Sequence, residues 1–135
     1  MFLRKLLETE KQAFLCLASL VMKADGIIAE REMEIIKNLK DEMNAQNLLC
    51  NLTEAESFAI LAASKRSVKR AIYMELSAIA KSDGNVDEKE EKYLKNVLSQ
   101  LGLSEVFSRN VQKWLDVYSR LLEKGVYLAL GKKKE

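Results

Sequence analysis

The stretch "KSDGNVDEKEEKYL", Lys81 to Leu94, contains an Asp-Gly pair, then an apolar residue, and then a glutamate six positions after the glycine. The same skeleton occurs earlier in the chain as "KADGIIAEREMEII", Lys23 to Ile36. Asp-Gly pairs are common at turns, and both copies are flanked by residues with helical periodicity. The chain is therefore predicted to contain a helix–loop–helix unit twice.

The repeat extends beyond the two loops. With a shift of 58 residues, the segment 19–38 lies on the segment 77–96 with eight of 20 positions identical. Neither unit can bury its apolar faces by itself. We therefore expect the two halves, about 13–44 and 71–103, to pack against each other about an approximate twofold axis. That arrangement would bring the two loops near one another. The identical pairs are Ser19/Ser77, Lys23/Lys81, Asp25/Asp83, Gly26/Gly84, Glu30/Glu88, Glu32/Glu90, Lys37/Lys95 and Asn38/Asn96.

The composition and the positions of the glycines favour an all-α fold. The chain of 135 residues has no proline and five glycines, each at or near a place where a helix is expected to end. We predict a compact bundle of six to seven helices in a single domain, 1–131, with a frayed tail at 132–135. The expected helices are about 2–24, 30–44, 54–63 with Thr53 and Glu56 as a capping box, 67–83, 87–102 and 104–125, with a further turn in "VYLAL".

Apolar spacing predicts which side chains face the core. The first helix has a stripe that includes Leu3, Leu6, Leu7 and Phe14, and the second is expected to turn Met33 inward. In the last helix one stripe is shared by Trp114, Tyr118 and Leu121, which are expected to be buried.

Charge and residue types exclude several classes of function. The net charge is only +2 and histidine is absent, which removes the commonest general base and the commonest transition-metal ligand. Cys16 and Cys50 have apolar neighbours, so we expect buried free thiols in a reducing compartment. Acidic residues interrupt the apolar N-terminal pattern, and the uncharged run 12–22 is too short to span a bilayer. We predict a cytoplasmic protein that is not an enzyme and has no membrane span.

The Asp-Gly loops have a purely structural interpretation. A helix ends, glycine takes the left-handed conformation, and a new helix starts. Asp87 and Glu90 would then form a capping box. The first copy fits less well, because Ala29 at the expected cap position cannot accept a hydrogen bond, a loss of about 1 kcal/mol. Capping therefore leaves Glu32 unexplained.

A cation site is the alternative interpretation. Asp25 and Asp83 stand at predicted helix C-termini, where an anion opposes the dipole by about 0.3–1 kcal/mol. The skeleton matches the second half of a calcium-binding EF-hand loop, but apolar and basic residues replace the first ligands, so a true EF-hand is excluded. One aspartate and one bidentate glutamate give three of the roughly six to eight oxygens that calcium takes. Two loops would therefore share a weak Ca²⁺ or Mg²⁺ site, and this interpretation and the structural one both remain open. The expected ligands are Asp25, Glu32, Asp83 and Glu90, supported by Glu30, Asp87 and Glu88, with Gly26 and Gly84 as loop glycines.

The motifs "ADGIIAERE" and "SDGNVDEKE…LSQLGL" resemble the tellurite-resistance TerB family, over about Ala13 to Leu103. The resemblance implies a helical bundle with internal pseudo-twofold symmetry. It also implies an acidic surface or pocket where the two loops meet, with calcium-type metal binding, and a role as an interaction module. The first copy departs from the second, since Ala29 stands where the second has Asp87.

These features predict an interaction protein with an unidentified protein partner in a stress response, for which a homo-oligomer stays open. A second class is a binder of nucleic acid or an anionic membrane surface. It would use Lys65, Arg66, Lys69 and Arg70, which we interpret instead as a solvated helix face.

Overall fold

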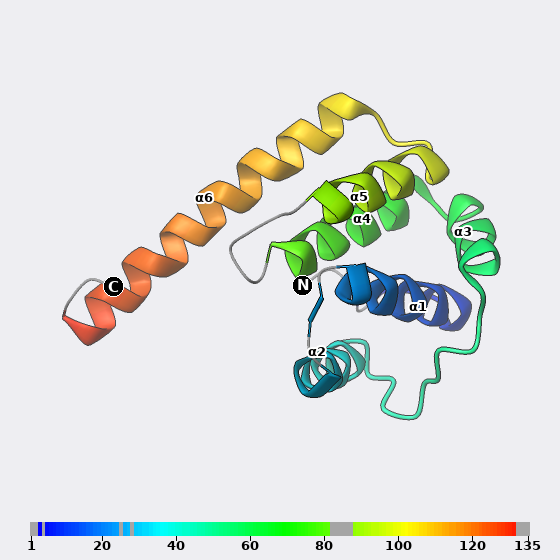
Figure 1. Ribbon diagram of the computed structural model, residues 1–135, viewed down its shortest axis with the longest axis horizontal. Coiled ribbons are helices and arrows are strands. Elements are labelled where there is room, and N and C mark those ends of the chain that lie inside the picture. Colours follow the sequence, from blue (N-terminus) through cyan, green and yellow to red (C-terminus); the bar gives the residue numbers. More distant parts are fainter. Residues whose placement is uncertain (1–2, 4, 25, 28, 82–87, 132–135) are drawn as a thin grey trace. The chain divides into compact units, whose positions relative to one another are not determined.

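The computed structural model describes residues 3, 5–24, 26–27, 29–81 and 88–131. The described residues form six helices and no strand, which confirms the all-α prediction (Figure 1). The pseudo-twofold relation of the two halves stays a prediction. The helices are α1 (Glu8–Ala24), α2 (Ala29–Glu42), α3 (Glu54–Ala62), α4 (Arg66–Ala80), α5 (Glu88–Gln100) and α6 (Glu105–Leu130).

The chain divides into two compact units. The first, Met1–Ser104, carries α1 to α5, and the second, Glu105–Glu135, carries α6. The prediction of one domain over 1–131 stays a prediction, and the predicted frayed tail, 132–135, lies outside the described residues.

Helix α1 is the central element of the first unit. Its residues 13–18 are all buried, and Val21 and Met22 continue the buried surface. A helix that is apolar on all sides packs in the core, whereas an amphipathic one lies on the surface. Accordingly, α1 contacts α3 and α4 most extensively and also packs against α2 and α5. In the same unit, α4 packs on α5.

Three helices of the first unit end with the same backbone motif. At the end of α1, the Gly26 N–H donates to the Lys23 carbonyl at 3.2 Å, and the Ile27 N–H donates to the Met22 carbonyl at 3.1 Å. These two bonds define a Schellman end, in which the residue after the helix takes the left-handed conformation. Gly26 has φ +70°, and Gly102 after α5 has φ +66° with the equivalent bonds. Glycine therefore stops α1 and α5, as the sequence predicts.

Helix α2 ends in the same way without glycine. Asn44 has φ +54°, and the Ala45 N–H donates to the Lys40 carbonyl at 2.9 Å. Asparagine tolerates the left-handed conformation better than most residues do. The helix therefore ends at Glu42, close to its predicted end at Asn44.

Side-chain hydrogen bonds mark the starts of α3 and α1. The capping box before α3 is confirmed: the Glu56 N–H donates to Thr53 Oγ1 at 3.1 Å, and the Thr53 N–H donates to Glu56 Oε1 at 3.0 Å. Helix α1 begins at Glu8, six residues after its predicted start at Phe2. There the Leu7 N–H donates to Glu10 Oε1 at 2.8 Å, so a glutamate side chain satisfies a donor at the true helix start.

Two predictions about core residues are wrong in the first unit. Leu7 is 68% exposed because it precedes α1 and does not share that helix's periodicity. Met33 is 73% exposed, because α2 packs mainly on α1 and buries only a narrow stripe, with Leu39 its one fully buried residue.

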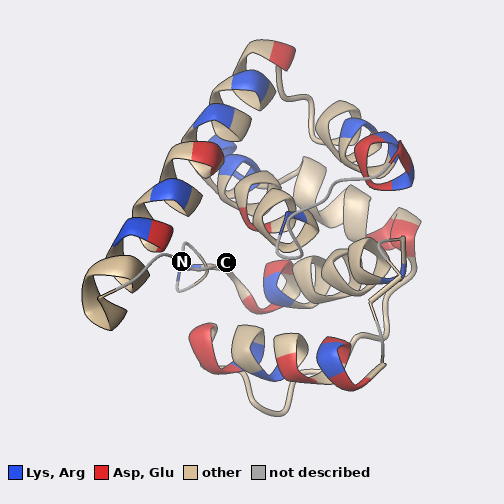
Figure 2. Cartoon of the chain, turned by 60° about the vertical axis from the view of Figure 1, so that its left-hand side comes forward, with Lys and Arg blue, Asp and Glu red and all other residues tan. Residues whose placement is uncertain are grey.

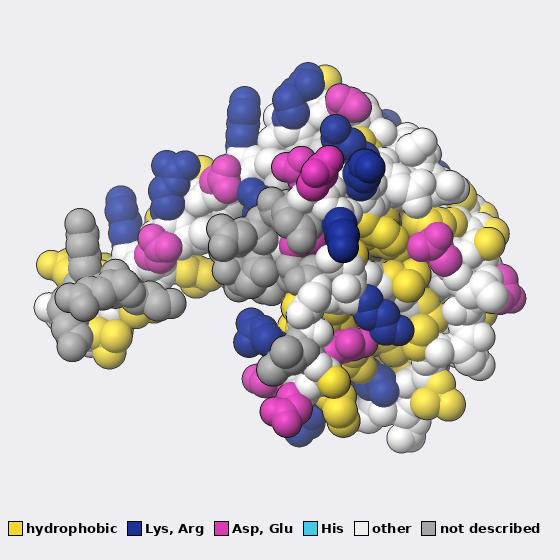
Figure 3. All heavy atoms as spheres, in the orientation of Figure 1, with side chains coloured by type: hydrophobic (Ala, Val, Ile, Leu, Met, Phe, Trp, Pro, Cys, Tyr) yellow, Lys and Arg dark blue, Asp and Glu magenta, His cyan; other side chains and the backbone are white. Residues whose placement is uncertain are grey.

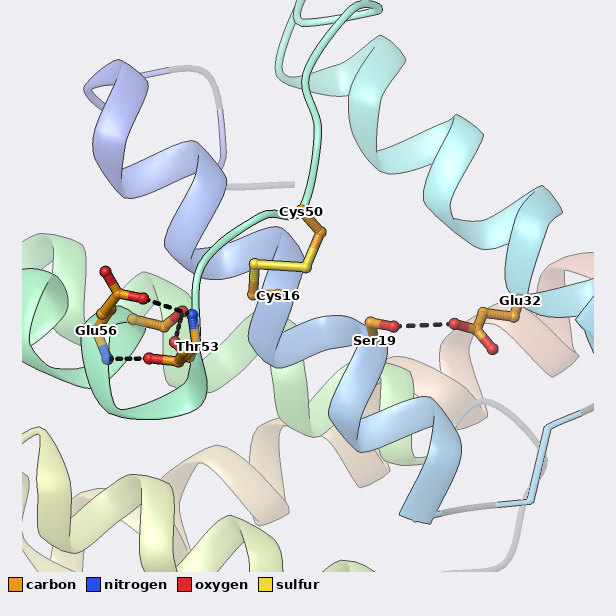
Figure 4. The surroundings of a disulfide bond; sticks show 7 residues. Cys16, Ser19, Glu32, Cys50, Thr53 and Glu56 are labelled. Atoms are coloured by element: carbon orange, nitrogen blue, oxygen red, sulfur yellow. Dashed lines mark hydrogen bonds between the residues drawn. A yellow bond between two sulfur atoms is a disulfide. The ribbon is translucent and has the colours of Figure 1, made fainter.

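The prediction of free thiols is also wrong. Cys16 and Cys50 form a disulfide, with their Cα atoms 5.1 Å apart and a sequence separation of 34 (Figure 4). Cys16 is buried on α1, as its neighbours suggest, but Cys50 lies exposed in the connection between α2 and α3. Apolar neighbours in sequence do not reveal burial in an irregular segment, since such a segment has no regular face.

The second unit consists of α6, which runs through Gly125 to Leu130. One glycine costs a helix about 1 kcal/mol, which is too little to end a strongly amphipathic one. Trp114 and Tyr118 stack with ring centroids 5.5 Å apart. The predicted burial of Tyr118 and Leu121 is wrong, since both are exposed; the unit offers no second helix that could cover the stripe.

Candidate cation site at the paired acidic loops

Four of the predicted site acids lie in the first turns of two helices. Glu30 and Glu32 are in the first turn of α2, and Glu88 and Glu90 are in the first turn of α5. Glu30 and Glu88 are exposed. The other predicted members, Asp25, Asp83, Asp87 and the loop glycine Gly84, lie outside the described residues.

Glu32 has a partner across the helix pair. The Ser19 hydroxyl on α1 donates a hydrogen bond to Glu32 Oε1 on α2 at 2.9 Å (Figure 4). Glu32 is half-buried there. This bond joins two helices on opposite sides of the first Asp-Gly loop, so Glu32 has a structural role that does not depend on a cap at residue 29.

The equivalent pair of the second copy is more deeply buried. The shift of 58 residues places Ser77 on Ser19 and Glu90 on Glu32. Glu90 is 1% exposed on α5 and Ser77 is fully buried on α4, and these two helices pack together. Within the part of the chain that the structure describes, Ser77 Oγ has no hydrogen-bond partner. The two copies thus keep a serine and a glutamate but bury them to different depths.

Helix starts account for part of the acidic pattern. The N-terminal end of a helix carries partial positive charge, so a carboxylate in the first turn is stabilised by about 0.3–1 kcal/mol at the surface. The first turns of α2 and α5 contain two and three glutamates respectively. Glu30 and Glu88, being exposed, fit this explanation without any ligand.

The described acids do not complete a metal site by themselves. Among residues 3, 5–24, 26–27, 29–81 and 88–131, no group of three or more Cys, Asp or Glu side chains is placed to hold a metal ion. Calcium takes about six to eight oxygen ligands. A site at these loops therefore depends on Asp25 and Asp83 in addition to Glu32 and Glu90.

Helix α4 begins with the opposite charge. Lys65 stands at its N-cap without a side-chain cap, and the first turn has no acidic residue. Lys65 and Arg66 are exposed, whereas Lys69 and Arg70 are half-buried. Acidic and basic residues alternate along the helices rather than forming separate segments (Figure 2). The face drawn in Figure 3 shows side chains of both charges among apolar patches.

Tyr93 on α5 is the titratable group with the largest shift among those described here. Burial, and next the nearby Glu54 carboxylate on α3, raise the pKa of Tyr93 well above its usual range. The phenol therefore stays protonated at neutral pH and is unsuited to act as a base.

Among the residues that the structure describes, two surface pockets lie away from the acidic helix starts. One, of ≈ 400 Å³, is lined by Lys5, Glu10 and Lys65 among others, and a second, of ≈ 370 Å³, lies between the start of α1 and residues 44–51. Neither is lined by any of the four described site acids. Sequence reasoning missed both pockets, since they form between segments distant in the chain.

The sequence model for the family described as "Tellurite resistance protein TerB" matches residues 11–113 of the 135. The chain belongs to the TerB family. The match confirms the resemblance, includes both acidic copies, and makes the chain a tellurite-resistance-type module. Residues 114–131, most of α6, lie beyond the match. Neither a curated protein nor a solved structure matches the chain.

None of the described helices, the 26-residue α6 included, is both long and apolar enough to cross a bilayer.

Proposed function

We propose that this TerB-family chain is a non-catalytic interaction module of a stress response in the cytoplasm, and that its two acidic loops together bind a divalent cation weakly. The observation that carries the proposal is the retention of one aspartate and one glutamate in each copy, within the region that the family match covers. The ligands would be Asp25, Glu32, Asp83 and Glu90.

The donor set fits a hard cation. Carboxylate oxygens suit Ca²⁺ and Mg²⁺, and histidine and free thiolates, which soft metals prefer, are absent from the ligand set. Glu32 already gives one oxygen to Ser19, so a cation would take its other oxygen or replace the serine. Glu30 and Glu88 are exposed and add negative charge near the helix starts. Because Ser19 already engages one oxygen of Glu32, a cation at this site would bind with weak affinity.

A purely structural acidic cluster is the second candidate, and one observation favours it. The hydrogen bond from Ser19 to Glu32 joins α1 to α2 without any ion. Under this alternative the glutamates orient the helices of a protein-interaction domain, and metal has no effect on stability.

The non-catalytic assignment rests on the side chains available. The sequence has no histidine, which is the commonest general base near neutral pH. Neither described pocket contains the candidate acids. A basic surface at the start of α4 remains the alternative for nucleic acid or anionic membrane, with only two of its four cations exposed.

Thermal unfolding in metal-free buffer and with added CaCl₂ or MgCl₂ tests the cation proposal. A ligand at about ten times its Kd stabilises the folded state by about 1.4 kcal/mol, so we expect the wild-type Tm to rise by a few degrees at roughly 10 mM metal. Glu32→Gln should lose most of this rise, and the neighbouring exposed Glu34→Gln should keep it.

Two outcomes separate the alternatives. No metal-dependent rise, together with a lower metal-free Tm for Glu32→Gln, would support the structural cluster and refute the cation. A salt-sensitive shift with an oligonucleotide, lost in Lys65→Gln/Arg66→Gln, would instead support the basic surface.

The stress role has a cellular test. A bacterial strain that depends on this chain to grow on tellurite should lose growth with Asp25→Asn/Asp83→Asn. It should keep growth with Asp41→Asn/Asp116→Asn, which removes the same charge elsewhere. Equal growth of the two double variants would contradict a role for the loop aspartates.

A further inference from the structure

The disulfide between Cys16 and Cys50 joins a buried residue to an exposed one. Cys16 is 2% exposed within the buried run of α1, whereas Cys50 lies exposed in the connection from α2 to α3. Figure 4 shows the bond reaching from the α1 helix to this irregular segment. An attacking thiolate must reach one of the two sulfurs, so access decides where exchange begins.

The disulfide is the main attachment of residues 49–51 to the rest of the first unit. Leu48 is buried at 6% exposure and the Thr53–Glu56 capping box follows, but Leu49, Cys50 and Asn51 between them are exposed. Exposed side chains contribute little apolar burial, so the attachment of residues 49–51 to α1 depends mainly on the disulfide.

The same segment forms one wall of a pocket. The cavity of ≈ 370 Å³ is lined on one side by Glu8 and Gln12 of α1 and on the other by residues 44–49 and Asn51. Gln12 precedes Cys16 by one helical turn, and Cys50 stands between two lining residues. The disulfide therefore fixes the distance between the two walls.

The geometry points to a redox clasp, in which Cys50 is the site of thiol–disulfide exchange with a low-molecular-weight thiol, Cys16 is the resolving cysteine, and the bond closes residues 44–51 onto α1. Disulfides in reducing compartments are usually transient and redox-sensing, so a reversible bond suits the proposed location. The inference does not depend on the cation proposal.

The exchange balances with glutathione as the reductant. Its thiolate attacks Cys50 Sγ, a bond forms between these sulfurs, and the Cys16–Cys50 bond breaks with its electron pair on Cys16 Sγ, which takes a proton from water. A second glutathione thiolate attacks the glutathione sulfur of the mixed disulfide and releases Cys50. Two glutathione molecules leave as glutathione disulfide, and the reverse sequence closes the clasp.

Two single variants test the order of attack. Folded Cys16→Ser and Cys50→Ser are treated with glutathione disulfide, and the mixed disulfide is followed by mass spectrometry. Cys50 should react at least about tenfold faster than Cys16, since only exposed thiols are readily reached. Equal rates, or faster reaction at Cys16, would overturn the assignment of Cys50 as the entry site.

The wild-type chain tests the clasp without any substitution. It is equilibrated in glutathione buffers of graded ratio, alkylated and weighed, and its amide hydrogen exchange is measured at both extremes. We expect a single two-electron transition, and roughly tenfold faster exchange for residues 44–52 in the reduced state, with α4 unchanged as the control. Thiols that stay free at every ratio, or exchange that is equal in both states, would overturn the clasp.

Discussion

Thr53 and Glu56 form a reciprocal capping box at the start of α3. Thr53→Ala removes the side-chain oxygen that accepts from Glu56 N–H, so we expect a loss of about 1 kcal/mol in the free energy of unfolding. Urea unfolding at pH 7 measures it. Thr9→Ala, at an exposed site in α1, is the matched control and should change the midpoint little. A loss no larger than the control's would contradict the capping role.

The same capping box makes the free energy of unfolding depend on pH in the acidic range. The Thr53 backbone N–H, and next its hydroxyl, lower the pKa of Glu56 below its usual value. A lowered pKa in the folded state contributes stability above the unfolded value, which is lost as pH falls through the folded value. The difference in unfolding free energy between wild type and Thr53→Ala should therefore shrink as pH falls below about 4.5.

Tyr93 makes the free energy of unfolding depend on pH in the basic range. Its pKa is raised by burial and by Glu54, so the folded state retains the phenol proton. Its contribution is complete below the unfolded pKa, near 10, and falls as pH rises above it. Wild type should lose up to about 1 kcal/mol more than Tyr93→Phe between pH 9 and pH 11, after allowance for solvent screening. If Tyr93→Phe loses as much stability as wild type over this pH range, the raised pKa of Tyr93 is refuted.

Between elements, the bond from Ser19 to Glu32 connects α1 with α2. Ser19→Ala leaves Glu32 without this donor, and we expect the metal-free protein to lose about 1 kcal/mol by chemical denaturation. Ser99→Ala, exposed on α5, is the control. If the two variants are equally stable, the bond does not hold the helices together.

The disulfide ties the connection before α3 to α1. Cross-linking two residues at a sequence separation of 34 restricts the unfolded chain, so Cys50→Ser should lower the unfolding free energy of the oxidised protein by about 3–4 kcal/mol. Under a strong thiol reductant the variant and wild type should unfold at the same denaturant concentration. A difference that persists in reductant would assign the effect to packing rather than to the bond.

Several element boundaries could be predicted from the sequence, and their physical reasons are local. Gly26 and Gly102 end helices because they take the left-handed conformation, and Thr53 starts one because its hydroxyl caps. The start of α1 at Glu8 coincides with a hydrogen bond from the Leu7 N–H to the Glu10 side chain. The pairing of Cys16 with Cys50 depends on tertiary structure, which local sequence does not encode.

At the scale of the whole chain, the all-α class and family could be predicted, because periodicity and the repeated motif extend over most of the chain. The candidate site could be predicted only as a set of residues. The repeat predicts the same ligand role for Glu32 and Glu90, yet Glu32 is half-buried against Ser19 and Glu90 is 1% exposed on α5. Burial depth depends on how helices pack, which two copies of one motif need not share.

Titration calorimetry with CaCl₂ tests most directly the central claim that the paired loops bind a divalent cation. Wild type should release or absorb saturable heat at millimolar calcium, within the roughly 10⁻⁴–10⁻³ M range of weak oxygen-ligand sites. Asp25→Asn/Asp83→Asn should abolish that heat, and Asp41→Asn/Asp116→Asn should preserve it. Absence of saturable heat in the wild type, or heat that persists in Asp25→Asn/Asp83→Asn, would contradict the claim.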